Sequence, residues 1–305
     1  MNFSTQEDTL AGGLPAGVAV NDNPGSKDAG PASPPPTIVI EPTQKWASLQ
    51  LREIWEHREL LYFLVWRDLK VRYKQTALGV VWVLLQPLLM TIVFTAVLGR
   101  LVRVPSEKVP YALFAYSGLT LWIFFSGAVS ITGNCLVQNA NLITKVYFPR
   151  LIVPLASILA RLVDLLVSLV ILGVLMFYYR VGFSSQIVMV PVLVLLLSAL
   201  ALAFGLWTSA VNVKYRDVGL ALPVLIQLWM FLSPVVYPAS QVPEKYRLFY
   251  SLNPLVGLLD GFRAALFGTP FTWYPILVST IITLVLLPYA AYVFVAREKT
   301  FADII

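Results

Sequence analysis

Two ionisable residues, Arg161 and Asp164, lie within an otherwise uncharged apolar run that extends from residue 151 to residue 179. They are three positions apart, so on a helix their side chains face the same way. Ionisable groups inside a membrane helix are energetically expensive and by default indicate function. The same spacing also fits a pair that neutralises itself, or an Arg161 side chain that extends to the nearby membrane interface. The two residues therefore predict an intramembrane polar site or local charge compensation.

Aromatic residues are the second group that could take part in a function, and they make up 13% of the chain. Their flat faces could stack against sugar rings and so line a path for a glycan. For each of them, packing in the interior or membership of an interfacial belt is the alternative. The candidates for a pore lining or an intramembrane site are Arg161, Asp164, Tyr116, Trp122, Phe125, Trp207, Trp229 and Tyr237.

Motifs for catalysis and metal binding are missing from the sequence. It contains no Gly-x-x-x-x-Gly-Lys-Ser/Thr, no His-Glu-x-x-His and no Gly-x-Ser-x-Gly, which are signatures of P-loop ATPases, zinc proteases and serine hydrolases. A single cysteine, Cys135, excludes an intrachain disulfide, and a single histidine, His57, leaves few ways to build a zinc site. We therefore expect this chain to have no catalytic residues and to bind no cofactor or metal.

The elements that position these residues are predicted to be membrane-spanning helices. Hydrophobic residues make up 58% of the 305-residue chain and charged residues only 12%, against about 45–50% and about 25% in soluble proteins. Because a span needs about 20 mostly apolar residues, the apolar runs predict an all-α polytopic membrane protein with six spans. They lie near residues 79–100, 110–132, 151–178, 186–210, 218–237 and 272–295.

The distribution of charge predicts the orientation of the chain. Thirteen lysines and arginines flank the spans on one side and seven on the other, where Arg263 is counted. Since basic flanks favour the cytoplasm, both termini are predicted to be cytoplasmic. Residues 1–44 contain seven prolines and carry a net charge of −4, which is typical of a disordered tail and unlike a signal peptide. The net charge of +6 therefore reflects a positive-inside pattern and not nucleic-acid binding.

Residues 45–75, before the first span, combine apolar positions at helical spacing with a basic face. Arg67, Lys70 and Lys74 recur at i, i+3 and i+7, so they share one side of a helix. This pattern predicts an amphipathic helix lying on the cytoplasmic leaflet. A plain basic flank that obeys the positive-inside rule is the alternative.

Two further segments differ from both spans and ordinary loops. Residues 134–147 form a polar stretch ahead of Pro149 and predict a short cytoplasmic helix, which is a natural docking site for a soluble partner. On the outside, residues 239–270 contain an apolar part, 255–267, that is too short to span. Such a length predicts a re-entrant or interfacial helix, which must be buried in protein or line a cavity.

Several stretches, taken in order, resemble the type-2 ABC export permeases that move O-antigen, capsule and teichoic-acid polysaccharides. They are 66–74 (WRDLKVRYK), 76–79 (TALG) with Trp82 and Gln86-Pro87, 139–154 (NANLITKVYFPRLIVP), 213–217 (VKYRD), Ser233-Pro234 with Tyr237-Pro238, and 253–263 (NPLVGLLDGFR). The resemblance covers about residues 45–300. The order of these motifs, together with six predicted spans, carries it. The Pro-rich tail departs from the shorter start of that family.

The resemblance implies the permease subunit of an ATP-driven exporter in the inner membrane of a bacterium. Its substrate would be a lipid-linked polysaccharide, in the first place an O-antigen. Two copies would form the pore as a homodimer, and two copies of a separate P-loop ATPase would use ATP and Mg²⁺. The outside segment 239–270 would close the exit.

Two sets of contact residues follow from the resemblance. The ATPase would dock on the helix 134–147, and phosphates suit arginine and lysine, so basic residues of the interfacial helix would contact the pyrophosphate of a polyprenyl-linked glycan. The docking candidates are Asn139, Asn141, Lys145, Phe148 and Arg150. The candidates for lipid phosphate and the membrane interface are Arg67, Lys70, Arg72 and Lys74.

Three alternatives remain open from the sequence. The same architecture could export drugs or lipids. A membrane enzyme acting on polyprenyl-linked sugars would have to use acids such as Asp164 and Asp260. An ion-driven secondary transporter would usually show an inverted internal repeat, and the sequence contains no visible repeat.

Overall fold

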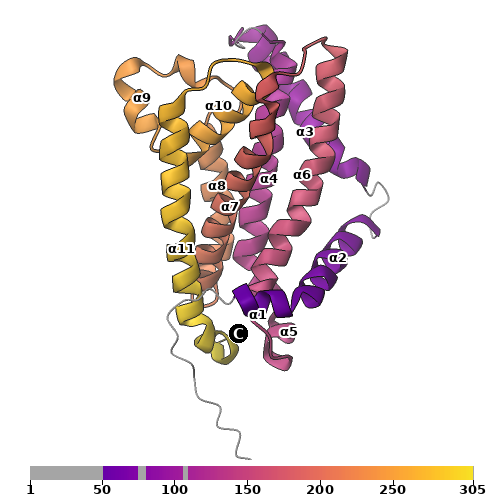
Figure 1. Cartoon of the computed structure of the whole chain (residues 1–305), viewed down its shortest axis with the longest axis vertical. Helices are drawn as coiled ribbons and strands as arrows, with labels where there is room; N and C mark the ends of the chain where they lie inside the picture. Colours follow the sequence, from indigo (N-terminus) through magenta and orange to yellow (C-terminus); the bar gives the residue numbers. More distant parts are fainter. Residues whose placement is uncertain (1–50, 75–79, 106–108, 305) are drawn as a thin grey trace, which may run out of the picture. The chain divides into compact units, whose positions relative to one another are not determined.

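The computed structural model describes residues 51–74, 80–105 and 109–304, which belong to one compact unit, 46–305. Over these residues the chain is helical and contains no strand (Figure 1). The predicted all-α class is therefore confirmed. The predicted tail 1–44 and the start of the predicted interfacial helix lie outside the described residues.

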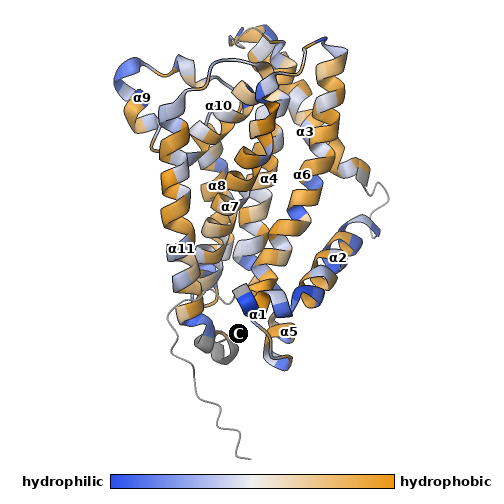
Figure 2. Ribbon diagram, viewed as in Figure 1, coloured by the Kyte–Doolittle hydropathy of each residue, from blue (hydrophilic) through white to orange (hydrophobic). Residues whose placement is uncertain are grey.

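Five helices of the described part are long and apolar enough to cross a membrane. They coincide with five of the six predicted spans. They are α3 (Val80–Phe94) continued by the π-helical η1 (Thr95–Leu101), α4 (Tyr111–Gln138), α6 (Ile152–Tyr178), the short η2 (Ser185–Met189) continued by α7 (Val190–Asn212), and α11 (Trp273–Ile304). Hydrophobic residues follow these helices along their length, as Figure 2 shows.

The predicted span 218–237 is represented by a shorter helix, α8 (Asp217–Phe231). Fifteen helical residues extend for about 22 Å, which is less than a hydrocarbon core of about 30 Å. The helix stops before Ser233-Pro234, because a residue that precedes proline disfavours helical backbone. A sixth crossing therefore stays a prediction.

Helix α4 lies at the centre of the bundle, packed against α6, α7, α3 and α8 (Figure 1). Its most apolar stretch is 78% buried, against 11% for the first candidate span, Val81–Leu101. Glycines make this close packing possible. Around Gly118, Gly127 and Gly133 a neighbouring atom stands within 2.8 Å of the place where a Cβ atom would lie. Helix α4 is thus the scaffold on which the functional side chains are arranged.

The predicted interfacial segment is helical and broken at His57, giving α1 (Leu51–Glu56) and α2 (Arg58–Lys74). Leu64 of α2 is buried, and α2 packs against α6. Its exposed side carries Tyr62, Phe63 and Trp66 next to basic residues. Aromatic and basic residues together suit a membrane surface, and the interfacial position itself stays a prediction.

The outside segment contains η3 (Ala239–Gln241), α9 (Glu244–Tyr250) and α10 (Pro254–Phe267). Helix α10 begins at an Asn253 cap, whose side chain accepts from the Leu255 amide at 3.1 Å. It ends at Gly268, which has φ +72°, the left-handed conformation that glycine adopts freely. Helix α10 is almost wholly buried against α11 and α7, as a non-spanning helix at depth must be.

Candidate functional site

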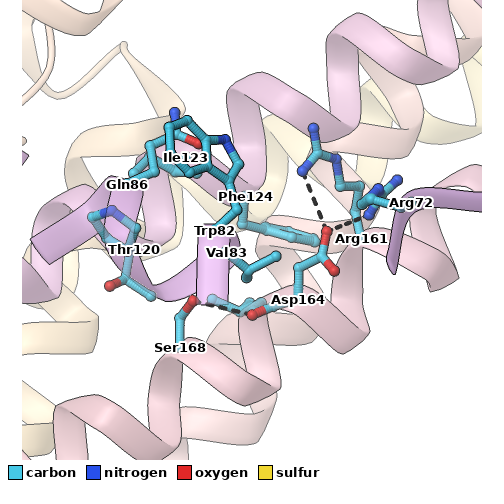
Figure 3. Close-up of a pocket in the computed structure, with 12 residues that line it drawn as sticks. Arg72, Trp82, Val83, Gln86, Thr120, Ile123, Phe124, Arg161, Asp164 and Ser168 are labelled. Atoms are coloured by element: carbon cyan, nitrogen blue, oxygen red, sulfur yellow. Dashed lines mark hydrogen bonds and ion pairs between the residues drawn. The ribbon is translucent and has the colours of Figure 1, made fainter. Parts of the chain in front are cut away.

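The carboxylate of Asp164 is the meeting point of two helices. It accepts hydrogen bonds from Arg72 and Tyr73 of α2 and from Arg161 of its own helix, α6, the last at 3.2 Å. The predicted proximity of Arg161 and Asp164 is present, and Figure 3 shows the carboxylate between the two guanidinium groups. Burial, together with the bond to Asp164, raises the pKa of Tyr73 above its usual value, so its hydroxyl stays a donor.

The carboxylate at the centre of this ion cluster lies far from both ends of α6, whereas Arg72 and Tyr73 come from the last turn of α2. Asp164 is twelve residues after Ile152, the start of α6, which corresponds to about 18 Å. Its side chain is only 8% exposed, and those of Arg72 and Arg161 are about a quarter exposed. A buried carboxylate is destabilising unless it is paired and hydrogen-bonded. Three donors meet that requirement for Asp164.

A cavity of about 330 Å³ adjoins the cluster between α2, α3, α4 and α6 (Figure 3). Its wall is mixed in character. The polar residues that line it are Arg72, Gln86, Thr120, Arg161, Asp164 and Ser168, and Trp82 contributes an aromatic ring. Two guanidinium groups and one carboxylate give this lining a net positive charge.

Arg161 leaves much of its donor capacity unused. A guanidinium carries five N–H donors, and Arg161 donates only through Nη1 among the described residues. Its Nε is buried without an acceptor in the described part of the chain. The group lies so close to α4 that a Cβ on Gly127 would stand 2.7 Å from its Nη2. Glycine at this position therefore admits the guanidinium to the cavity.

The four basic candidates of α2 have different surroundings. Arg67 is bonded to Asp68 at 2.8 Å and to the side-chain oxygen of Asn139 at 2.9 Å. Arg72 binds Asp164, whereas Lys70 and Lys74 are exposed. Arg67 and Arg72 therefore hold α2 to the bundle, whereas Lys70 and Lys74 face outward. Arg67 thus differs in exposure from Lys70 and Lys74, with which it was predicted to share one helix side.

A second cavity of about 350 Å³ lies between α2 and the C-terminal part of α4. Arg72 lines both cavities. Cys135 lines the second cavity and is 1% exposed. Because Cys135 is the single cysteine of the sequence, its thiol is a natural reporter on the contact between α2 and α4.

Three aromatic rings form a cluster between α4, α7 and α8. Phe125 meets Trp229 edge-to-face at 5.3 Å and Phe204 at 6.3 Å, and Phe204 meets Trp229 at 4.9 Å. Trp122 lies beside Phe125 at 6.1 Å. Three of the predicted pore aromatics are thus brought together, and Phe204 joins them.

The other three aromatic candidates lie elsewhere. Tyr116 is fully buried and its hydroxyl donates to the Ser168 carbonyl at 3.2 Å. Trp207 is 44% exposed on α7. Tyr237 follows the end of α8, and its hydroxyl donates to the Phe231 carbonyl at 2.9 Å. No single ring of aromatics is formed by the predicted set within the described residues.

The predicted cytoplasmic helix 134–147 is divided in the structure. Its first residues are the end of α4, and α5 (Ala140–Lys145) follows after Asn139, whose side chain donates to the Cys135 carbonyl at 2.8 Å. Asn139 is therefore the joint between α4 and α5. Asn141 and Lys145 are exposed on α5.

The remaining docking candidates have internal partners. Phe148 is buried in a cluster that includes Phe301 at the end of α11. The Arg150 amide donates to the Glu298 carboxylate at 3.0 Å, and its guanidinium binds the Glu298 carbonyl. By contrast, Tyr147 is fully exposed beside half-exposed Val146. The sequence did not identify Tyr147 as a docking candidate, because no pattern in the neighbouring residues indicates that its ring is exposed.

Arg263, counted above among the seven basic residues on one side of the spans, is only 3% exposed. It donates to the carbonyls of Pro234 and Val235, each at 2.6 Å, and lies 3.7 Å above the Phe114 ring. Its charge is therefore enclosed by the protein and does not act as an exposed flank, and the side of the membrane on which it lies stays a prediction. Helix α10 folds back onto the bundle and carries Arg263 into it, which a count of charges between spans cannot reveal.

Known proteins of similar sequence are described as membrane proteins of ABC-2 type transporters and as export or transport proteins for polysaccharides. Residues 59–267 match the family described as ABC-2 type transporter. The O-antigen export system permease protein RfbA of Myxococcus xanthus is 31% identical over 256 residues, which are 83% of this chain and 98% of that protein. RfbA of Klebsiella pneumoniae is 26% identical over 67% of this chain and 79% of its own length. The polysialic acid transport protein KpsM of Escherichia coli is 24% identical over 65% and 78%.

Proposed function

This chain belongs to the ABC-2 type transporter family, and on that premise we propose that it is the permease subunit of an ATP-driven polysaccharide exporter. The observation that carries the proposal is the 31% identity to a protein named as an O-antigen export permease, over 98% of that protein. The substrate is a lipid-linked O-antigen polysaccharide. The chain is a multi-pass protein of the bacterial inner membrane.

The partners follow from the division of labour in such a system. The sequence has no P-loop, so ATP and Mg²⁺ belong to a separate ATPase, of which two copies bind a homodimer of this chain. We place the docking surface on α5 and the loop after it, where Asn141, Lys145 and Tyr147 are exposed. Exposed aromatic side chains are frequent anchors of interfaces. Asn139, Phe148 and Arg150 support this surface from within.

The membrane arrangement follows the orientation of basic residues. Six crossings, with α8 as the fifth, leave both termini in the cytoplasm, and α9 with α10 forms a re-entrant pair that closes the exit. Helix α2 lies on the cytoplasmic leaflet, where exposed Lys70 and Lys74 attract anionic headgroups. Within the aromatic cluster, Phe125 is fully buried, whereas Phe204 and Trp229 are partly exposed, so these two rings offer surface along the path of the glycan.

Deletion of the gene tests the proposal. The cell should lose long polysaccharide from its surface, seen as loss of the high-molecular-weight ladder on a lipopolysaccharide gel, and the wild-type gene should restore it. Accumulation of polyprenyl-linked glycan inside the cell separates an export defect from a synthesis defect. Surface polysaccharide that is unchanged in the deletion would refute the proposal and favour the same architecture exporting drugs or lipids.

Docking is tested separately by copurification with the ATPase subunit of the same export system. Tyr147→Ala should weaken the complex by about tenfold or more, because truncation of an aromatic anchor commonly costs about 2 kcal/mol or more. Tyr215→Ala is the matched control, since Tyr215 is another exposed tyrosine on a different loop. Equal copurification of both variants with the ATPase would refute the proposed docking surface.

A further inference from the structure

We propose that the cavity between α2, α3, α4 and α6 is an anion site that takes the diphosphate of a lipid-linked substrate. Arg161 and Arg72 bind the diphosphate, which replaces the Asp164 carboxylate as their partner. The inference rests on the proposed function for the identity of the substrate. It assigns the recognition of phosphate to an intramembrane cavity instead of the exposed lysines of α2.

The charge of the cavity fits such a ligand. Two guanidinium groups and one carboxylate line it, so the lining attracts an anion even while Asp164 is in place. Arginine binds phosphate oxygens through two parallel N–H bonds. Arg161 can supply such a pair, because only its Nη1 donates among the described residues. The hydroxyls of Thr120 and Ser168 and the amide of Gln86 add neutral polar groups to the lining.

The size and position of the cavity fit a lipid-linked ligand. Its volume of about 330 Å³ lies within the range of small-ligand sites. One wall is α3, and the first candidate span, to which α3 belongs, is only 11% buried. Leu89, Ile92 and Val93 on α3 are about half exposed or more. An apolar chain attached to the diphosphate can therefore lie along α3 while the charged group occupies the cavity.

Asp164 links ligand binding in the cavity to the attachment of α2. It ties Arg72 and Tyr73 of α2 to Arg161 of α6. A diphosphate that takes both arginines leaves Asp164 with Tyr73 as its remaining donor. Binding of substrate therefore weakens the attachment of α2 to the bundle.

Binding of farnesyl pyrophosphate to the purified full-length protein tests the inference. The protein is placed in phosphatidylcholine nanodiscs in a phosphate-free buffer, and binding is measured by calorimetry. Arg161→Gln should raise the Kd by about tenfold or more, equivalent to about 1.4 kcal/mol. Asp164→Asn should lower the Kd, because it removes the competing carboxylate. A merely structural role for the cluster would not produce opposite changes in the two variants.

Two further variants keep the test independent of folding. Gly127→Ala retains every charge but places a methyl group 2.7 Å from the Arg161 Nη2, so it should also weaken binding. Arg180→Gln removes an exposed charge two residues beyond the C-terminal end of α6 and should leave the Kd unchanged. An absence of binding to the wild type, or the same Kd for Arg161→Gln and the wild type, would overturn the inference.

The source of the phosphate is decided by two comparison ligands. Inorganic pyrophosphate should bind much more weakly than farnesyl pyrophosphate, and phosphatidylglycerol in the nanodiscs should not compete. If either matched farnesyl pyrophosphate, the lipid-linked substrate would be overturned as the ligand. If the protein exports glycan but does not bind farnesyl pyrophosphate, this inference alone is refuted. A protein that binds it while its deletion leaves the surface glycan intact refutes the proposed function alone.

Discussion

Two arginines lie against glycines of α4, and they differ in what their donors do. Arg263 contacts α4 at Gly118, is 3% exposed and donates to backbone carbonyls of residues 234 and 235. Arg161 contacts α4 at Gly127, is about a quarter exposed and donates to one carboxylate beside a cavity. The first arginine is enclosed by the fold, and the second is held next to open space.

The difference separates structural from functional charge. Arg263 provides hydrogen bonds for carbonyls that the end of α8 leaves open, and it also lies over the Phe114 ring. Such a buried charge persists because its removal would leave buried acceptors without donors. Arg161 has N–H donors that bind no acceptor among the described residues, and it lines a polar cavity. Both properties are expected of a residue that binds a ligand. The variants below separate these roles, beginning with the largest expected effect.

Arg263→Leu should have the largest effect on stability. It leaves the carbonyls of Pro234 and Val235 buried without their donor, and each unsatisfied buried acceptor costs about 1–3 kcal/mol. We expect little monodisperse protein after detergent extraction and a much lower melting temperature. A melting temperature equal to that of the wild type would contradict the structural role of Arg263.

The pair Gly118→Ala and Gly127→Ala compares the two sites directly. A Cβ at position 118 would stand 2.1 Å from the Val235 carbonyl oxygen, whereas the three atoms nearest to one at position 127 all belong to the Arg161 guanidinium. Backbone cannot move as freely as a guanidinium, so Gly118→Ala should be destabilising by about 1–3 kcal/mol and Gly127→Ala by much less. Thermal melting of both variants in one detergent measures this, and equal melting temperatures would refute the distinction.

Asp164→Ala should loosen α2 without unfolding the bundle. It removes the acceptor of Arg72, Tyr73 and Arg161, and a lost partner of charged groups costs about 1–3 kcal/mol. Cys135, buried beneath α2, should then react with a maleimide about tenfold faster or more. Cys135→Ser combined with Asp164→Ala controls for labelling that does not occur at Cys135. An unchanged rate would show that Asp164 does not hold α2.

Arg180→Gln should have the smallest effect. Arg180 is exposed at the end of α6, and surface substitutions usually change stability by less than about 0.5 kcal/mol. Melting temperature and surface polysaccharide should both equal those of the wild type. A large loss in either would mean that arginine charge in general, and not its place in the fold, determines the effects above.

The sequence predicted the helical class, five of the spans and the contact of Arg161 with Asp164, because apolar runs and i, i+3 spacing are local signals. It did not predict that Arg72 and Tyr73 reach the same carboxylate from 91 or 92 positions away. That contact depends on how α2 packs on α6, which no local pattern records. The burial of Arg263 was missed for the same reason.

The docking and pore candidates show a second limit. Arg150 has the charge expected of a docking residue but is bonded to Glu298 at the end of α11. Trp207 lies apart from the aromatic cluster and is 44% exposed on α7, so its place in a pore stays a prediction. Residue type alone could not separate these from Tyr147 or Trp229, because the distinction depends on which neighbours the fold supplies.

The most direct test of the central claim is to express Gly127→Ala in the deletion strain and measure how much surface polysaccharide it restores. The variant keeps all charges, and only the Arg161 guanidinium must move. At equal membrane abundance, we predict a reduction in surface polysaccharide of about fivefold or more relative to the wild type, with Arg180→Gln unaffected. Wild-type amounts of polysaccharide with Gly127→Ala would contradict the claim that Arg161 and its cavity take part in export.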